Sequence, residues 1–479
     1  MSVKRSILGN TAFQIGGKIV AVAIGILTVA VMTRYLGPED YGQFTTVLSY
    51  LQFFAIAAGF GLPLALTRMI SKEGTDERRV VANVFALRLA SGLVIFGAAP
   101  LIALAFPYPG AVKIGIAIGA LSFLALTLSE TLKGILQKHL TAWKSSLAET
   151  AGRLLMFGCV AGAVASGFGL LSFVLALSLS NILQFGMTYA MARKHGPIGL
   201  KFERPAWTET LVETWPIGVS ILFNLLYLKG DVVILSIMRT QAEVGLYGAA
   251  YKVLDVLVSV PYIFMGLVLP PLTAAWSRAD RTGFNHKLSQ SFDFLALIAV
   301  PLMAGGFAVA SDLMALVGGE EFRSSGQFLA ILMIGMLAVY WHALYAHAYV
   351  AMGQQRKFIW VFATNAIICL PLYFVLIGKF GALGAAWVTA FSELFVAIAV
   401  TVSVSKMTGF VPDLKRLAKI VIATAVMFAL LLAAARLHVL VRIALGMASY
   451  ALALYALGGL PMEAMKSALA RPGVRNISE

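Results

Sequence analysis

Five basic and five acidic side chains lie inside segments of this sequence that are otherwise apolar. A charge at the centre of a membrane-spanning helix costs about 3 kcal/mol on insertion scales, so such residues by default mark a cavity or a transport pathway. Lysine and arginine in this setting could bind an anionic group while it crosses a region of low dielectric constant. The ten residues are Lys18, Arg88, Glu130, Glu149, Arg153, Lys229, Asp231, Lys252, Asp255 and Glu393.

The spacing of four of these charges leaves two uses open. Glu149 and Arg153 are four residues apart with the acid first, which favours an ion pair within one helix over contact with a substrate. Lys252 and Asp255 are three residues apart, and they could form a similar pair or bind a substrate. The sequence alone does not separate a structural pair from a binding site here.

Asp231 and Lys18 also have alternative roles. Asp231 follows Lys229 by two residues, so it could neutralise that lysine locally or stand apart as a coupling site for a proton or Na⁺. Lys18 is close to the basic N-terminus of the chain, and its side chain could extend to the cytosolic surface instead of facing a cavity.

Metal or cofactor chemistry has little support. His342 and His347 are five residues apart, which separates them around a helix, unlike a metal-binding pair at i and i+4. Cys159 and Cys369 lie in apolar runs, where thiols behave as small hydrophobic groups. We therefore expect no metal site, no disulfide and no cofactor, and packed or hydrogen-bonded histidines.

The elements that position these residues follow from composition. Hydrophobic residues make up 60% of the 479 residues and charged ones 12%, whereas soluble domains carry about 25% charged residues. The apolar runs reach the ~20 residues that a membrane-spanning helix needs, and they lack the alternation of a membrane β-barrel. We predict an all-α membrane protein with about 14 transmembrane helices, near 11–33, 41–66, 81–106, 111–132, 147–166, 169–191, 214–238, 245–270, 291–317, 325–352, 357–377, 381–404, 416–435 and 439–460.

Basic residues are distributed unevenly among the loops between these helices. The two termini and the even-numbered loops hold 25 lysines and arginines, and the odd-numbered loops hold 7. Because basic residues gather on the cytoplasmic side of short loops, both termini of a multi-pass membrane protein are predicted in the cytosol. This asymmetry accounts for most of the net charge of +15, so no nucleic-acid partner is expected, whereas membrane lipids are.

An internal repeat divides the chain. Residues 168–183 align without gaps with 380–395, and the stretch around Gly42 aligns with the one around Gly245. Two repeats of the same orientation are related by an axis along the membrane normal. We predict an N-terminal lobe at 1–195, a cytosolic linker at 196–213, a second lobe at 214–406, two extra helices at 407–460 and a cytosolic tail at 461–479.

Equivalent positions in the two repeats indicate which cationic side chains are the best candidates for the cavity. Lys18 and Lys229 lie in the first helix of each repeat, so they are the leading candidates for cations that face a bound head group. Arg88 is the third candidate, and Lys252 and Arg153 complete the set.

A polar stretch, "TRYLGPEDYGQF" at 33–44, interrupts the first apolar region. Gly37 permits a turn, Pro38 suits the first position of a helix, and Glu39 and Asp40 lie where the helix dipole favours carboxylates. Locally, the stretch is a helix start at a membrane surface and needs no substrate.

Several short stretches, taken in order, indicate more than this local feature. The chain resembles the polysaccharide-biosynthesis (Wzx-type) flippases of the multidrug/oligosaccharidyl-lipid/polysaccharide exporter superfamily over essentially its whole length. The stretches that carry the resemblance are "RYLGPEDYGQF", "GFGLPLAL" at 59–66, "AEVGLYGAAYKV" at 242–253, "GGEEFRSSGQFLAIL" at 318–332 and "FGALGAAWVTAFSEL" at 380–394.

The resemblance implies a fold and a function. It implies two six-helix lobes of related structure around a central cavity, which opens alternately to the two sides of the membrane. It also implies movement of a polyprenyl-diphosphate-linked oligosaccharide from the inner to the outer leaflet, for O-antigen, capsule or exopolysaccharide synthesis. A polymerase and other enzymes of the same pathway are implied as partners.

Two other classes of function compete with this one. A multidrug antiporter of the same superfamily would export organic cations, which favour acidic cavity walls, whereas the buried charges here are balanced. A membrane glycosyltransferase or polymerase would need a positioned acid, base or metal cluster, and the longest loop, 192–213, contains none. "GGEEF" also spells a signature of cyclic-di-GMP synthases, but its loop has no room for such a domain. We therefore expect a transporter and not an enzyme.

Overall fold

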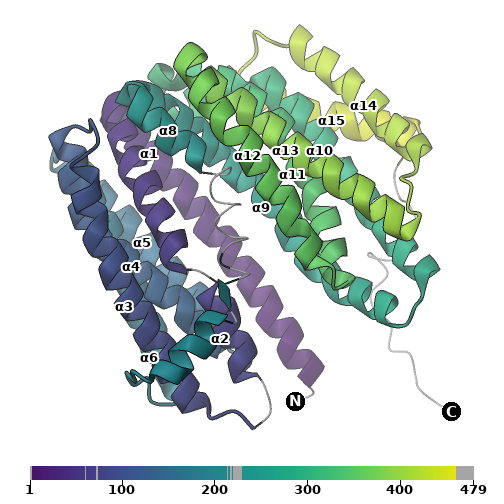
Figure 1. Cartoon of the computed structure of the whole chain (residues 1–479). Helices are drawn as coiled ribbons and strands as arrows, with labels where there is room; N and C mark the ends of the chain where they lie inside the picture. The colour runs from purple at the N-terminus through teal and green to yellow at the C-terminus, as the bar shows by residue number, and fades with distance from the viewer. Residues whose placement is uncertain are drawn as a thin grey trace.

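The structure is a computed structural model of the whole chain, and it describes residues 3–59, 61–71, 74–212, 214–215, 218 and 229–459. Within these ranges the chain forms helices and no strands (Figure 1). The helices are α1 (Val3–Gly59), α2 (Leu62–Ile70), α3 (Glu77–Ala103), α4 (Gly110–Lys138), α5 (Trp143–Ala165), α6 (Leu170–Ala192), η1 (Arg193–His195), a helical stretch at 204–212, α8 (Gly230–Met238), α9 (Gln241–Ser277), α10 (Arg281–Gly318), η2 (Glu320–Ser325), α11 (Gly326–Ala351), α12 (Gln355–Phe380), α13 (Ala382–Thr408), α14 (Leu414–Ala433) and α15 (Val439–Ala456).

The prediction of an all-α membrane protein is confirmed. Among the described residues, 12 helices are long and apolar enough to cross a membrane. One of them, the Gly16–Gly59 part of α1, contains the first two expected spans. The expected span at 214–238 lies partly outside the described residues, which contain its end as α8. These two differences account for the gap between 12 and the expected number.

Local signals in the sequence set the helix limits. The side chain of Asp76 accepts a hydrogen bond from the backbone N–H of Arg79 at the start of α3, and Thr240 caps α9 in the same way. Such caps satisfy N–H groups that have no partner within the helix. Inside α1, Gly37 adopts φ 68° and ψ 178°, and Pro38 follows it. The polar stretch therefore divides α1 at a kink into two helical segments, and the second begins at Pro38 as the sequence predicts.

The helices pack as two groups that lie side by side in Figure 1. Helix α1 packs with α3 to α6, and α9 packs with α10 to α13 around α11. The groups meet mainly where α1 contacts α9. We call them the first and second lobe; their exact limits in the sequence stay a prediction.

Helices α14 and α15 pack on each other and on α10, at the outer side of the second lobe (Figure 1). Two ion pairs tie them there. Arg416 of α14 contacts Asp293 near one end of α10, and Arg442 of α15 contacts Asp312 near the other end. Arg442 is buried, so α15 is fixed to the lobe through a charge that has little access to solvent.

The polar stretch at 33–44 forms the closest contact between the lobes. A Cβ atom added at Gly42 would lie 1.7 Å from the carbonyl oxygen of Gln241, and one added at Gly245 would lie 2.0 Å from that of Pro38. Only glycine allows two backbones to approach so closely. The two glycines that the repeat aligns thus meet at the crossing of α1 and α9.

Further contacts surround this crossing. Thr46 donates a hydrogen bond to the Gln241 side chain at 2.6 Å, and Arg34 donates one to the Leu316 carbonyl oxygen at 2.6 Å. The hydroxyls of Tyr108 and Ser236 are 3.0 Å apart. Between described residues, the hydrogen bonds that join the lobes all lie at this end of the molecule, which we call the Gly37 end.

Candidate functional site

The second lobe holds two lysines around one carboxylate. Lys229 immediately precedes α8, while Lys252 and Asp255 lie one turn apart on α9. The Nζ atoms of Lys229 and Lys252 lie 3.5 and 3.6 Å from the two Asp255 oxygens. The Lys229 ammonium group also lies 4.4 Å from the ring centre of Tyr251, a cation–π contact. Two positive charges thus share one negative charge.

Asp231 does not neutralise Lys229 by an ion pair. Its carboxylate is fully buried and accepts hydrogen bonds from the Tyr247 hydroxyl at 2.7 Å, the Thr389 hydroxyl at 3.2 Å and the Val232 backbone N–H at 2.7 Å. These partners come from α8, α9 and α13, so Asp231 holds the core of the second lobe together. A coupling role for Asp231 stays a prediction.

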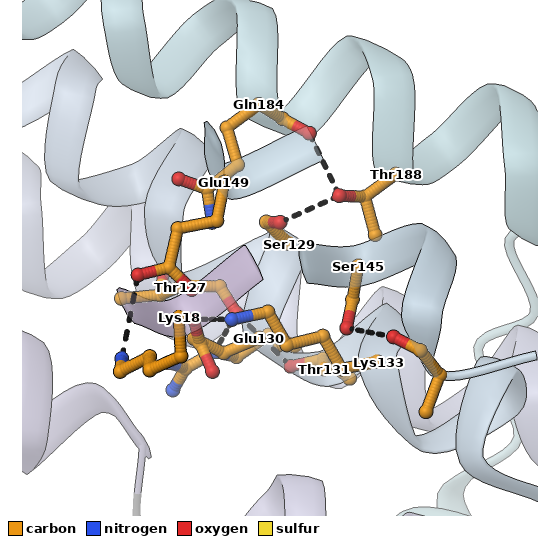
Figure 2. A network of polar contacts seen from close by, with 12 residues as sticks. Lys18, Thr127, Ser129, Glu130, Thr131, Lys133, Ser145, Glu149, Gln184 and Thr188 are labelled. Carbon is orange, nitrogen blue, oxygen red and sulfur yellow. Dashed lines mark hydrogen bonds and ion pairs between the residues drawn. The ribbon is translucent and has the colours of Figure 1, made fainter. Parts of the chain in front are cut away.

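In the first lobe, the carboxylate of Glu149 on α5 pairs with Lys18 of α1 at 3.4 Å. Figure 2 shows the two side chains pointing toward one another between their helices. The ion pair expected between Glu149 and Arg153 is not formed in the described part of the chain. Helix α1 packs on α5. Lys18 of α1 therefore takes the place of Arg153 as the ion-pair partner of Glu149.

Arg153 lies against α1 and faces the second lobe. A Cβ atom added at Gly25 would lie 3.9 Å from its guanidinium group. Arg153 interacts electrostatically with Glu149 and, across the lobe boundary, with Lys252. Basic side chains of the two lobes therefore approach one another.

Sequence analysis missed Lys133. Helix α4 continues to Lys138, past the expected end of its span at residue 132. Lys133 therefore lies within the helix, close to the charged side chains described above. Lys133 pairs with Glu130 at 2.6 Å and interacts electrostatically with Glu149 (Figure 2). The spacing of three between Glu130 and Lys133 was the signal that could have identified the pair.

Arg88 forms no ion pair with these side chains between described residues, although it interacts electrostatically with Glu130. It is 2% exposed on α3, and its Nε donates to the Thr127 carbonyl oxygen at 3.4 Å. Its guanidinium group lies beneath the end of α1, because a Cβ atom added at Gly59 would be 3.7 Å from it. Arg88 is therefore not open to a substrate in this conformation, and its role as a cavity cation stays a prediction.

We call the group that spans both lobes the charged cluster. It has five positive and three negative side chains, and hence an excess of two positive charges. Each acid in it contacts at least one lysine. Its members are Lys18, Lys133, Arg153, Lys229 and Lys252 with Glu130, Glu149 and Asp255.

The cluster can attract an anion with two or more negative charges. Its lysines are 20% to 48% exposed, so they remain open to a ligand. Ammonium groups bind phosphate oxygens through short charge-assisted hydrogen bonds. In the described residues, no group of three or more histidine, cysteine or acidic side chains is placed to hold a metal ion.

Comparison with known proteins identifies the family to which the chain is similar. The family described as polysaccharide biosynthesis protein matches residues 7–276. The chain is 24% identical over 381 residues to the "Probable low-salt glycan biosynthesis flippase Agl15" of Haloferax volcanii, covering 78% of each chain. It is 23% identical over 344 residues to the "Succinoglycan biosynthesis transport protein ExoT" of Rhizobium meliloti, covering 69% of this chain and 66% of that one.

Among solved structures, the fold is similar to that of the Lipid II flippase MurJ in an inward closed conformation. The TM-score is 0.79 at 15% identity, and the match covers 92% of this chain and 97% of that one. At this identity the similarity concerns the fold alone.

Proposed function

We propose a flippase for lipid-linked oligosaccharide, from the premise that this chain belongs to the polysaccharide biosynthesis protein family. Two relatives named as a glycan biosynthesis flippase and a succinoglycan transport protein support transport of a polysaccharide precursor. We infer further that the precursor is linked to a polyprenyl diphosphate and moves from the inner to the outer leaflet of the bacterial inner membrane. The observation that carries this step is the positive excess of the charged cluster.

The diphosphate is the part of such a substrate with the highest free-energy cost of entering the membrane. Moving its charges through a medium of low dielectric constant needs compensating cations. Lys18 and Arg153 of the first lobe and Lys229 and Lys252 of the second can provide them together. Binding then draws both lobes onto one ligand, and Glu149 and Asp255 give up their lysines to the phosphate oxygens.

The position of the contacts between the lobes supports alternating access. The hydrogen bonds that join the lobes lie at the Gly37 end. In the predicted topology this end faces outward and both termini face the cytosol, so this structure represents the state that accepts substrate from the cytosol. Parting the lobes at the Gly37 end would release the glycan outside. A polymerase of the same pathway stays a predicted partner.

The charge balance also bears on the alternative, an antiporter for organic cations. A cation that enters the charged cluster would meet an excess of two positive charges. Attraction would require an acidic excess, which these side chains do not supply. The flippase therefore fits the observed residues better.

The test is the amount of lipid-linked oligosaccharide accessible at the outer leaflet of cells. We expect Lys18→Ala and Lys229→Ala, expressed at wild-type levels, to leave glycan on the cytosolic side. Lys379→Ala is the matched control, because Lys379 is exposed and lies outside the cluster. If deleting the whole protein leaves glycan export unchanged, the proposal is wrong and organic-cation transport becomes the function to test.

A further inference from the structure

The face of α1 that meets α9 continues beyond the crossing as a polar surface. At the crossing, Gly42 lies against the backbone of α9, and a Cβ atom added at Gly248 would lie 2.6 Å from the Thr45 side chain. Residues three and four positions apart share one face of a helix. The face that holds Gly42 and Thr45 therefore continues through Ser49 and Gln52. We call Ser49 and Gln52 the neutral wall.

Two members of the charged cluster lie on the corresponding face of α9. Gly245 and Gly248 form the contact with α1, and the next positions on the same face of α9 are Lys252 and Asp255. The two charges that share an ion pair on α9 thus continue the surface that begins at the crossing.

The neutral wall and these two charges lie opposite one another. The spacing of residues beyond the crossing is the same on both helices, so the register that the glycine contacts set continues along them. Asp255 also interacts electrostatically with Tyr41 of α1, which agrees with this placement. A neutral polar surface of the first lobe therefore faces a charged surface of the second.

Both surfaces become more exposed with distance from the crossing. On α1, Ser49 is 7% exposed, whereas Gln52 is half-buried. On α9, Gly248 is buried, whereas the side chains of Lys252 and Asp255 are each 38% exposed. The two lobes also spread apart from the Gly37 end in Figure 1. The surfaces are thus in contact at the crossing and open to a ligand beyond it.

The neutral wall has hydrogen-bonding groups that the protein does not use. Between described residues, neither the Ser49 hydroxyl nor the Gln52 amide forms a hydrogen bond. Gln52 follows Pro38 by 14 residues, which is about 21 Å along the helix, so it lies deep in a membrane-spanning segment. An amide without a partner in hydrocarbon is strongly unfavourable. Water or a polar ligand is therefore expected beside the neutral wall.

The chemistry of the neutral wall suits a ligand that is rich in hydroxyl groups. Glutamine offers two N–H donors and a carbonyl acceptor, and serine both donates and accepts. Phosphate oxygens form their strongest hydrogen bonds with cations, which this wall lacks, and a polyprenyl chain has no polar group. In a lipid-linked oligosaccharide, the group bonded directly to the diphosphate is a sugar. Its hydroxyl groups match the neutral wall.

Asp255 gives an independent reason to place a sugar here. In the proposed function, Lys229 and Lys252 turn to the phosphate oxygens and leave the Asp255 carboxylate without them. A carboxylate in surroundings of low dielectric constant needs other donors. Sugar hydroxyl groups can donate to it without bringing a charge that competes for the diphosphate. One sugar ring can thus contact Asp255 of the second lobe and Gln52 of the first.

We propose that Ser49, Gln52 and Asp255 form a subsite for the sugar next to the diphosphate, and that hydrogen bonds to the hydroxyl groups of this sugar select the substrate. Binding involves hydrogen bonds alone, and no covalent bond changes. This inference rests on the proposed function, and it identifies the part of the substrate that the first lobe recognises.

The experiment measures what the sugar adds to binding. The reference probe is farnesyl methyl diphosphate, which has the diphosphate diester and no sugar. The other probes carry glucose, galactose or N-acetylglucosamine in place of the methyl group, and each is titrated into the purified full chain in detergent by calorimetry. The readout is the Kd of the reference probe divided by the Kd of the tightest sugar probe. For wild type we expect a ratio of about ten, the effect of one or two hydrogen bonds.

Two substitutions test the neutral wall without removing a cation. Gln52→Leu and Ser49→Ala should each lower the ratio toward one, through weaker binding of the sugar probes. Gln327→Leu is the matched control, because Gln327 is exposed at the start of α11, and it should keep the wild-type ratio.

The outcomes separate the subsite from the proposed function. If wild type binds the reference probe but binds no sugar probe more tightly, or if Gln52→Leu keeps the full ratio, the subsite is wrong and the flippase stands. If wild type binds neither the reference probe nor the sugar probes, the cationic site of the proposed function fails, and the subsite fails with it. Should Gln52→Leu unfold, as judged by its melting temperature in detergent, Ser49→Ala decides in its place.

Discussion

Replacing Gly42 with alanine should weaken the contact that joins the two lobes at the Gly37 end. The added Cβ atom would lie 1.7 Å from the carbonyl oxygen of Gln241 and 2.9 Å from the backbone nitrogen of Gly245. Both neighbours are backbone atoms of α9, which cannot turn aside as the end of a flexible side chain can. The substitution therefore forces the crossing of α1 and α9 apart.

The size of the effect follows from the cost of overpacking. Inserting a methyl group into a well-packed contact costs about 1–3 kcal/mol. In the proposed alternating-access cycle this contact is lost when the lobes part at the Gly37 end, so the cost falls on the closed state and not on the open one. At about 1.4 kcal/mol per tenfold change, the ratio of open to closed molecules should rise by roughly 5- to 150-fold.

The assay is a distance measurement between two spin labels at the Gly37 end. Cysteines at Glu39 of the first lobe and Lys379 of the second, both exposed, would carry the labels after replacement of the two native cysteines. Gly42→Ala should move the distance distribution to longer values. Gly97→Ala is the matched control, because a Cβ atom added at Gly97 on α3 meets nothing within 4 Å. Equal distributions for Gly42→Ala and wild type would refute the reasoning.

Three further predictions follow from other contacts. Arg442→Ala should destabilise the protein by about 2 kcal/mol, because the carbonyl oxygens of Ala308 and Leu431 lose their charged donor while Asp312 keeps Arg323 as a partner, and the melting temperature in detergent should fall accordingly. Asp255→Asn should tighten the binding of inorganic pyrophosphate in calorimetry, since two lysines lose their shared counter-charge; weaker binding would contradict the anion role of the cluster. The hydrogen bond from Arg79 lowers the pKa of Glu203 in the linker, so this contact is present above the ordinary glutamate pKa and is lost as the pH falls through the lowered value. Proteolysis of the linker should accordingly accelerate in acid for wild type, whereas Arg79→Ala should be cleaved rapidly at neutral pH as well.

The helices of this protein follow from its apolar periodicity, whereas the partners of its charges do not. Composition and spacing predicted the spans, and the repeat predicted that Gly42 and Gly245 are equivalent. Spacing favoured an ion pair of Glu149 with Arg153, but Glu149 pairs with Lys18, because spacing along one helix says nothing about the helix packed beside it. Tertiary contacts with a large sequence separation decide such pairs.

Two further residues were misjudged because the sequence does not show where a helix ends or which helices pack together. Lys133 escaped notice because charge ends an apolar run in the sequence but does not end a helix, and α4 continues for another turn and a half beyond it. His342 was expected to be packed or hydrogen-bonded, because its spacing of five from His347 does not suit a metal-binding pair. Its Nδ1 atom lies 3.6 Å from a carboxylate oxygen of Glu393, which is 51 residues away on α13, and only the packing of α11 on α13 brings the two together.

In the proposed alternating-access cycle, the contact of Gly42 with Gly245 marks the axis that relates the lobes. Equivalent residues of two repeats of the same orientation are related by rotation about an axis along the membrane normal. Two equivalent residues can touch only if they lie on or beside that axis, so under the predicted repeat the axis passes through the crossing of α1 and α9. Opening at the Gly37 end then requires the lobes to tilt in opposite directions away from this axis, which parts the two glycines. We therefore expect the glycines at the crossing to control release at this end, although they carry no charge themselves.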